Sequence, residues 1–275
     1  MGGEGKASAG RLPGVALASW RLSLRYWTAK LALGALARTY LRVRTEGLER
    51  LPAGPALLCA NHMSWADPIV LMAALPGRPR LHWFGPRESD MHRGARNRLI
   101  VWTGTAVPYK PAKTDLLEAT RRVDAVFRAG GRLVIFGEGR IHAVEGELLP
   151  LADGAVFFAL RARVPIVPVA ISGTSWLGFG RTVRVRIGEP LLTAGRPTRE
   201  AVDEATARLW CRLFARVRDD PIRPAPGPLG RWLTAVFDEW AEGERPERTP
   251  GAVRAPGTGP VDGPYGPCDG VASPG

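Results

Sequence analysis

The sequence predicts an α/β fold in which a central sheet is covered by helices. Short apolar runs typical of strands alternate with longer amphipathic segments between residues 41 and 217, and this alternation is the pattern of α/β domains. Glycine and proline stand at many junctions between the segments, where turns are expected. Hydrophobic residues make up 45% of the 275 positions, which is enough for a buried core.

Composition divides the chain into four regions. Residues 1–13 are predicted to be disordered, residues 14–41 to be helical and residues 42–220 to form the folded body. Residues 221–275 hold 21 of the chain's glycines and prolines, which number 33 and 25. This tail is therefore predicted to be mostly disordered, apart from a short helix at 231–240.

The helix predicted over residues 14–41 is apolar on two sides. Its first face carries Leu17, Trp20, Leu24, Trp27 and Leu31, which are spaced by three or four residues. Basic side chains lie at the margins of this face. Such a helix either packs on its own domain or lies on a membrane surface, and the sequence leaves both possibilities open.

The first part of the body predicts two strands and a helix. Leu41–Glu46 alternates apolar and basic residues, as a strand with one buried face does. Ala56–Ala60 is continuously apolar and predicts a buried strand. The pair Asp67-Pro68 is a helix start, with Asp as N-cap and Pro at the first helical position, and this helix is expected to end near Leu75.

The middle of the body predicts a strand at 81–84, a short helix at 97–102 and a strand at 106–109. The next helix, 114–129, is the most regular, because its apolar residues repeat at helical spacing and Gly130-Gly131 follows it. The last elements are strands at 133–136, 166–171 and 183–187 and helices at 154–163 and 198–217. Two prolines in Val164–Ile171 favour an edge strand or an active-site wall over the middle of a sheet.

The net charge of +12 favours an anionic partner. Nucleic acid, a phosphorylated metabolite and an anionic lipid surface all meet this description, and a general bias toward arginine would also produce the charge. Nucleic acid is disfavoured, because the sequence has no nucleic-acid motif and no basic stripe interleaved with aromatic residues in the body.

The three cysteines, Cys59, Cys211 and Cys268, are odd in number and widely spaced. They therefore predict neither a disulfide framework nor a structural zinc site, and a reducing compartment is expected. The first ten residues lack the apolar core of a signal peptide. The sequence contains no run of about 18 apolar residues, so no ordinary transmembrane helix is predicted.

The segment Asn61–Asp67 can carry acid–base chemistry. A buried strand runs directly into His62, and Asp67 can fold back from the following helix onto the His62 ring. A carboxylate on one imidazole nitrogen fixes the tautomer and leaves the other nitrogen as a base. The spacing alone is weak support, since a capping Asp beside an unrelated loop histidine would look the same.

A second segment, Phe136–His142, follows another buried strand. Its glycines, Gly137 and Gly139, would allow close approach of an anion, and Arg140 could bind a phosphate. Glu138 could accept a hydrogen bond from a substrate hydroxyl. Read alone, the segment is equally an ordinary glycine turn with a solvated acid and base.

Together and in this order, these segments resemble the glycerolipid acyltransferase family, which includes 1-acylglycerol-3-phosphate acyltransferases. Asn61-His62 to Asp67, with Ser64, is similar to the family's NHxSxxD block. Phe136–Gly139 is similar to its FPEG block, and Val164–Val169 to its VPxxPV block. Gly104–Lys110 lies where the family has a further block that ends in a basic residue. The resemblance implies a mixed central sheet flanked by helices and makes residues 42–220 the acyltransferase domain.

The resemblance also implies a reaction. His62 would remove the proton of an acceptor hydroxyl, Asp67 would orient the imidazole, and the hydroxyl oxygen would attack an acyl thioester directly. The acceptor that the resemblance implies is 1-acyl-sn-glycerol 3-phosphate, and the donor is acyl-CoA or acyl-carrier protein. No metal or other cofactor is expected.

For the substrate, the resemblance implies that Glu138 and Gly139 position the glycerol backbone, while Arg140 and Lys110 hold the phosphate. Gly137 stands where the family usually has proline, and Arg140 follows Gly139 directly where the family more often has Thr-Arg. These departures keep open an acyltransferase for another lipid or glycolipid hydroxyl. A catalytically decayed membrane-binding protein is a further alternative. The expected location is peripheral, on the cytoplasmic face of an anionic membrane bound through residues 14–41.

Overall fold

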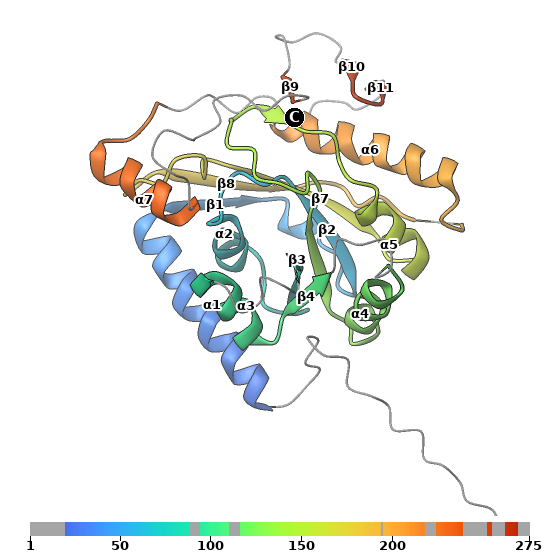
Figure 1. Ribbon diagram of the computed structural model, residues 1–275, viewed down its shortest axis with the longest axis horizontal. Helices are drawn as coiled ribbons and strands as arrows, with labels where there is room; N and C mark the ends of the chain where they lie inside the picture. The colour runs from blue at the N-terminus through green and yellow to red at the C-terminus, as the bar shows by residue number, and fades with distance from the viewer. Residues whose placement is uncertain are drawn as a thin grey trace, which may run out of the picture.

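The computed structural model describes residues 20–87, 94–109, 116–193, 195–217, 224–238, 252–254 and 262–268. In this part of the chain a seven-stranded sheet has the order β1-β8-β7-β2-β5-β3-β4 (Figure 1). Its strands are β1 (Arg42–Glu46), β2 (Ala56–Ala60), β3 (Leu81–Arg87), β4 (Ala106–Tyr109), β5 (Arg132–Phe136), β7 (Ile166–Ser172) and β8 (Thr182–Ile187). The sheet is mixed, because β7 and β8 are antiparallel while the other neighbours are parallel.

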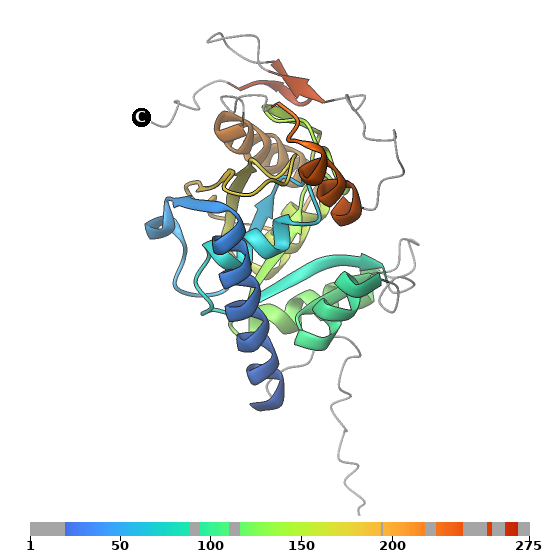
Figure 2. The ribbon, with the colours of Figure 1, turned by 90° about the vertical axis from the view of Figure 1, so that its left-hand side faces the viewer.

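Helices cover both faces of the sheet (Figures 1 and 2). They are α1 (Trp20–Tyr40), α2 (Asp67–Ala74), α3 (Gly94–Thr103), α4 (Leu116–Arg128), α5 (Gly154–Ala162), α6 (Arg199–Val217) and α7 (Pro228–Asp238), with a 3-10 turn at Leu48–Arg50. In β2, Leu57 and Cys59 join the core under α4, α5 and α6, whereas Leu58 and Ala60 join the core under α1 and α2. The predicted α/β fold is confirmed, and burial on both faces explains why β2 is continuously apolar.

Helix α1 packs on its own domain through one face only. Tyr26 is fully buried in the core on that face. The Lys30 Nζ donates to the carbonyls of Met72 and Leu75 at 2.6 and 2.7 Å, near the end of α2, where the helix leaves carbonyls unpaired. On its outer face, Trp20, Leu24 and Leu31 are 72%, 59% and 68% exposed. Residues 14–19 of the predicted helix lie outside the described residues.

The expectation of an edge position for the proline-containing strand is wrong. β7 lies between β8 and β2, inside the sheet. The Pro168 carbonyl accepts from the Gly188 N–H at 2.8 Å, so the proline nitrogen faces the same neighbour, β8. The ladder between β8 and β7 begins at Val169. Pro168 therefore lies just outside this ladder, where a backbone N–H is not needed for the pairing.

The chain beyond residue 220 corrects one further expectation, that for the cysteines. The short helix predicted at 231–240 is α7, and the other described residues of this tail include three short strands, β9 (Val253–Arg254), β10 (Asp262–Gly263) and β11 (Gly266–Pro267). β9 pairs with β6 (Glu147–Leu148). Cys268 forms a disulfide with Cys211 of α6, 57 residues away, and Cys59 is a buried free thiol. The prediction that the cysteines form no disulfide is therefore wrong, because two segments distant in sequence meet in the fold.

Loss of this disulfide should lower stability and free the end of the tail. Closing a loop of this length constrains the unfolded chain by about 4 kcal/mol at most. We expect Cys268→Ser to lower the melting temperature by several degrees. A titration of thiols in unfolded, unreduced protein should find one thiol, that of Cys59. Three reactive thiols in protein purified without reductant would contradict the pairing.

Candidate active site

Three loops meet where the parallel strands β2, β5 and β7 end. These strands are neighbours in the order β7-β2-β5, and the carboxyl ends of adjacent parallel strands open at one edge of the sheet. Asn61 and His62 follow β2, Gly137–Arg140 follow β5, and Thr174 follows β7. All three segments that the sequence singled out thus arrive at the same edge.

The contact predicted between His62 and Asp67 is present. The His62 Nδ1 lies 2.9 Å from the Asp67 Oδ2. The imidazole stacks on Phe136, with ring centroids 4.0 Å apart, and meets Trp65 edge-on at 5.8 Å. Because Asp67 occupies Nδ1, Nε2 is the ring nitrogen left for a substrate. This is the arrangement of a general base with an orienting carboxylate.

Asp67 is fully buried and accepts from four donors. Its Oδ2 accepts from the backbone N–H groups of Met63 and Ser64 at 2.7 and 3.0 Å, besides the His62 ring. Its Oδ1 accepts from the Thr174 hydroxyl at 2.6 Å. Asp67 is the first residue of α2, and its carboxylate turns back to the preceding loop instead of capping the helix. Such a set of donors suits an ionised carboxylate.

Two residues that sequence reasoning missed complete the frame. Asn61 ties the end of β2 to β7, since its Nδ2 donates to the Ile171 carbonyl and its Oδ1 accepts from the Ile171 N–H. Thr174 reaches Asp67 from the other side. Asn61 belongs to the recognised NHxSxxD block, so its position there was the available signal. Nothing in the local sequence around Thr174 marks it, because its partner lies 107 residues away.

Glu138 is placed differently from the expected substrate contact. Its carboxylate points into the protein, accepting from the His62 N–H at 2.6 Å and from the Leu149 N–H at 3.0 Å. It is not among the residues that line the cavity. Burial raises the pKa of the Glu138 carboxyl to about 8, although the two backbone donors oppose the shift. Glu138 therefore supports the backbone of His62.

This raised pKa predicts that stability falls as the pH rises from about 4.5 to 8. In that window the folded chain holds a proton on Glu138 that the unfolded chain has released, and the state that binds more protons loses stability as the pH increases. Urea unfolding at pH 5, 6, 7 and 8 should show this decline. The decline should be shallower in Glu138→Gln, and an equal slope in both proteins would contradict the assignment.

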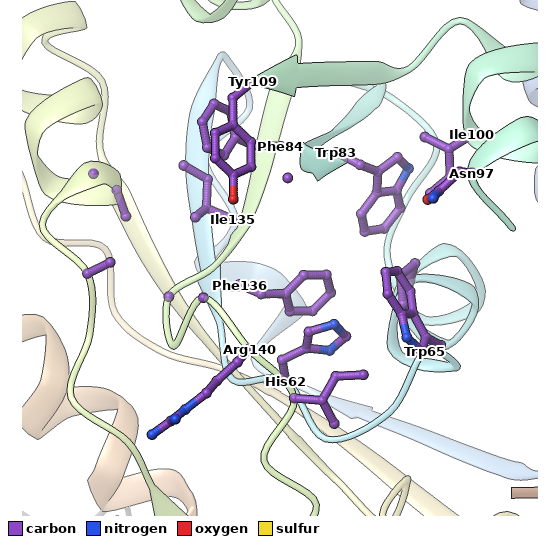
Figure 3. Close-up of a pocket in the computed structure, with 18 residues that line it drawn as sticks. His62, Trp65, Trp83, Phe84, Asn97, Ile100, Tyr109, Ile135, Phe136 and Arg140 are labelled. Atoms are coloured by element: carbon purple, nitrogen blue, oxygen red, sulfur yellow. The ribbon is translucent and has the colours of Figure 1, made fainter. Parts of the chain in front are cut away.

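A cavity of about 360 Å³ opens beside His62 (Figure 3). Most of its wall is apolar or aromatic, and the residues involved are Trp65, Pro68, Trp83, Phe84, Ile100, Tyr109, Ile135, Phe136, Ile141, Ala152 and Ala155. Polar lining is sparse and includes His62, Asn97 and Arg140. The reactive histidine thus stands at the edge of an apolar chamber.

The predicted phosphate-binding residues are only partly described. Gly139 and Arg140 line the cavity and are exposed. Figure 3 shows the Arg140 side chain extending away from the His62 ring. Lys110 lies outside the described residues. A Cβ at Gly137 would lie 2.8 Å from the Cys59 Sγ, so the side chain beneath this position explains why glycine stands here.

His142 contacts the backbone of His62. Its N–H donates to the His62 carbonyl at 2.7 Å, and its ring Nε2 lies 3.2 Å from the Glu147 Oε2. Burial lowers the pKa of His142, and the pairing with Glu147 opposes this shift.

In the part of the chain that the structure describes, no group of three or more His, Cys, Asp or Glu side chains could hold a metal ion.

The chain is similar to known acyltransferases. The acyltransferase family model matches residues 42–172. The chain is 28% identical over 221 residues to a 1-acyl-sn-glycerol-3-phosphate acyltransferase of Saccharomyces cerevisiae, covering 73% of this chain and 66% of the relative. It is 30% identical over 169 residues to the human beta enzyme of that name, covering 56% and 58%. Across the curated relatives, the matched part spans 42–66% of their length.

The fold is also that of a solved structure, the 1-acyl-sn-glycerophosphate (LPA) acyltransferase PlsC from Thermotoga maritima. The TM-score is 0.52 at 19% identity, over 72% of this chain and 80% of that one. The matched residues 42–172 contain Asn61–Asp67 and Phe136–Gly139, and they end at β7. Residues 42–172 therefore match the acyltransferase family model and contain both motifs, and the chain is similar in sequence to 1-acyl-sn-glycerol-3-phosphate acyltransferases.

Proposed function

We propose that the protein transfers an acyl group from an acyl thioester to the free hydroxyl of a lysophospholipid, with 1-acyl-sn-glycerol 3-phosphate as the acceptor. The observation that carries this proposal is the His62–Asp67 contact at the edge of an apolar cavity. The names of the curated relatives support the choice of acceptor.

The proposed reaction begins when the His62 Nε2 accepts the proton of the acceptor hydroxyl. The hydroxyl oxygen attacks the thioester carbonyl, an O–C bond forms, the C–S bond breaks, and the thiolate leaves with the bonding electron pair. The imidazolium then returns its proton to the thiolate. Asp67 stabilises the imidazolium through Nδ1 and keeps the ring in the productive tautomer. The acceptor oxygen attacks the thioester directly as His62 removes its proton, so no acyl-enzyme is required.

The cavity is proposed to hold apolar chain next to the reacting carbonyl. We propose that substrate bound against its aromatic and aliphatic wall keeps water from the base, which would favour acyl transfer over hydrolysis. Arg140, exposed at the cavity wall, is proposed to bind the acceptor phosphate together with Lys110. Gly139, with φ of 67°, lets the chain turn from Glu138, which is buried, to Arg140, which is exposed. Glu138 acts through the His62 backbone.

The proposed membrane contact is the outer face of α1. Trp20, Leu24 and Leu31 share this face, and Arg21 lies over the Trp20 ring at 5.5 Å. Exposed apolar residues beside basic ones favour an anionic bilayer surface. No helix in the described ranges has the length and apolar character to cross a bilayer. From the exposed side chains of α1 we propose peripheral binding at the surface of an anionic membrane.

Vesicle sedimentation tests the membrane contact. The triple variant Trp20→Ser, Leu24→Ser and Leu31→Ser should lose binding to phosphatidylglycerol vesicles while it keeps the wild-type melting temperature, because these side chains face solvent. Leu192→Ser, at an exposed leucine outside α1, is the matched control and should bind like wild type. Equal binding of the triple variant would refute this surface.

Release of free thiol from an acyl-CoA tests the reaction. We expect release that depends on added 1-acyl-sn-glycerol 3-phosphate and yields phosphatidic acid. The direct junction of Gly139 with Arg140 keeps another lipid or glycolipid hydroxyl as a second candidate acceptor. A panel of other lysolipids and glycolipids, with acyl-carrier protein as a second donor, separates the two. A protein inactive with the whole panel would be a decayed membrane-binding relative.

A further inference from the structure

Helix α7 contacts the His62 loop although it lies outside the matched domain. It comes from the proline-rich tail and lies near α2 in Figure 1. Its last residue, Asp238, is 3% exposed. The Asp238 Oδ1 accepts from the Ser64 hydroxyl at 2.8 Å and from the Trp65 N–H at 2.9 Å. A buried carboxylate 174 residues downstream thus binds the loop between His62 and Asp67.

The backbone donors of this loop are divided between two carboxylates. The N–H groups of Met63 and Ser64 bind Asp67, and the next one, that of Trp65, binds Asp238. The N–H of Ala66 donates to the Ser64 hydroxyl oxygen at 3.1 Å, and that hydroxyl donates to Asp238. Each consecutive amide is therefore occupied, which specifies one backbone conformation for the loop.

Helix α7 also binds the loop that carries Thr174. The Leu177 N–H donates to the Thr234 hydroxyl at 2.9 Å, and Thr234 donates to the Gly230 carbonyl. A Cβ at Gly230 would lie 2.8 Å from the Leu177 carbonyl oxygen, so α7 and this loop are in close contact. The helix thus binds both loops whose donors surround Asp67.

We propose that α7 is a positioning element of the acyltransferase site and that Asp238 is its positioning residue. By binding Ser64 and Trp65, Asp238 sets the loop that holds the Asp67 carboxylate against the His62 ring. It also sets Trp65, which meets the His62 ring and lines the cavity. The inference rests on the proposed function, and it extends the working site into the tail. Small displacements of catalytic groups cost about 100-fold in rate.

The test compares Asp238→Ala with Asp238→Asn by steady-state acyl transfer. Alanine removes the acceptor of Ser64 and Trp65, so kcat should fall by about 10- to 100-fold while KM for acyl-CoA changes by less than about threefold. Asparagine keeps an acceptor oxygen at Oδ1 and should restore kcat to within about threefold of wild type. Asp203→Ala, at an exposed carboxylate of α6 paired with Arg199, is the matched control and should leave kcat unchanged.

A second readout does not depend on substrate. In ¹⁵N-histidine-labelled protein, the His62 Nδ1–H resonance should shift or broaden in Asp238→Ala and return in Asp238→Asn. If wild type transfers no acyl group to any acceptor, the proposed function fails while this resonance still decides the positioning role. If Asp238→Ala does not fold, Thr234→Val replaces it, since it removes the Leu177 acceptor at nearly equal volume. A folded alanine or valine variant with wild-type resonance, and with wild-type kcat where activity exists, would overturn the inference.

Discussion

His62→Ala should lower kcat for acyl transfer by about 10²- to 10⁴-fold, the usual contribution of a positioned general base. The variant loses the only imidazole that lines the cavity in the described part of the chain. Asp67 keeps three donors, the N–H groups of Met63 and Ser64 and the Thr174 hydroxyl. No buried charge is left unpaired, so the melting temperature should stay within about 3 °C of wild type.

The matched control for this variant is His82→Gln. His82 is a buried histidine of β3 that does not line the cavity. Burial lowers its pKa to about 4, so it is neutral at assay pH and glutamine keeps a polar side chain there. We expect this variant to keep wild-type kcat. Acceptor-dependent thiol release at the wild-type rate in His62→Ala would remove His62 from the mechanism.

Asp67→Asn should also cost activity by about 10²- to 10⁴-fold, but with a loss of stability. The amide oxygen can accept at the Oδ2 position, where three donors converge. The amide NH₂ then faces the Thr174 hydroxyl, which can rotate to accept. The negative charge that stabilises the imidazolium is gone, and charge-assisted hydrogen bonds become neutral ones. We expect the free energy of unfolding to fall by about 3 kcal/mol.

Thr174→Val is the informative companion to Asp67→Asn. It removes only the hydrogen bond to Oδ1 at similar volume, so its effect on kcat should be smaller, about 3- to 10-fold. Measuring kcat and urea unfolding for both variants separates the effect of losing the carboxylate charge on kcat from the effect of lower stability. Full activity of a folded Asp67→Asn would show that His62 needs no carboxylate partner.

The elements that the sequence predicted best are those with a strong local pattern. Ala56–Ala60 is β2 as predicted, and the helix predicted over 114–129 is α4 over Leu116–Arg128, with 114 and 115 outside the described residues. The contact of His62 with Asp67 was equally predictable, because only five residues separate them and a strand and helix set the turn. Local spacing determines such features, and no distant partner is needed to specify them.

Other expectations failed because a distant segment decides the outcome. Glu138 was expected to face substrate, yet the N–H groups of His62 and Leu149 draw its carboxylate inward. Cys211 and Cys268 gave no local sign of pairing. The short helix predicted at 231–240 is α7, but its contacts come from loops more than 50 residues away, and the local sequence gave no sign of them.

By itself, the sequence determined the α/β fold, the alternation of buried strands and amphipathic helices, and the resemblance that joins Asn61–Asp67 with Phe136–Gly139. Periodicity and motif spacing are local properties, and they can be read without coordinates. Only the tertiary structure decided that Thr174 and Asp238 support the loop around Asp67, and that Glu138 supports His62. A buried carboxylate takes whichever donors the fold brings to it, and nothing in the residues beside it records which donors those are.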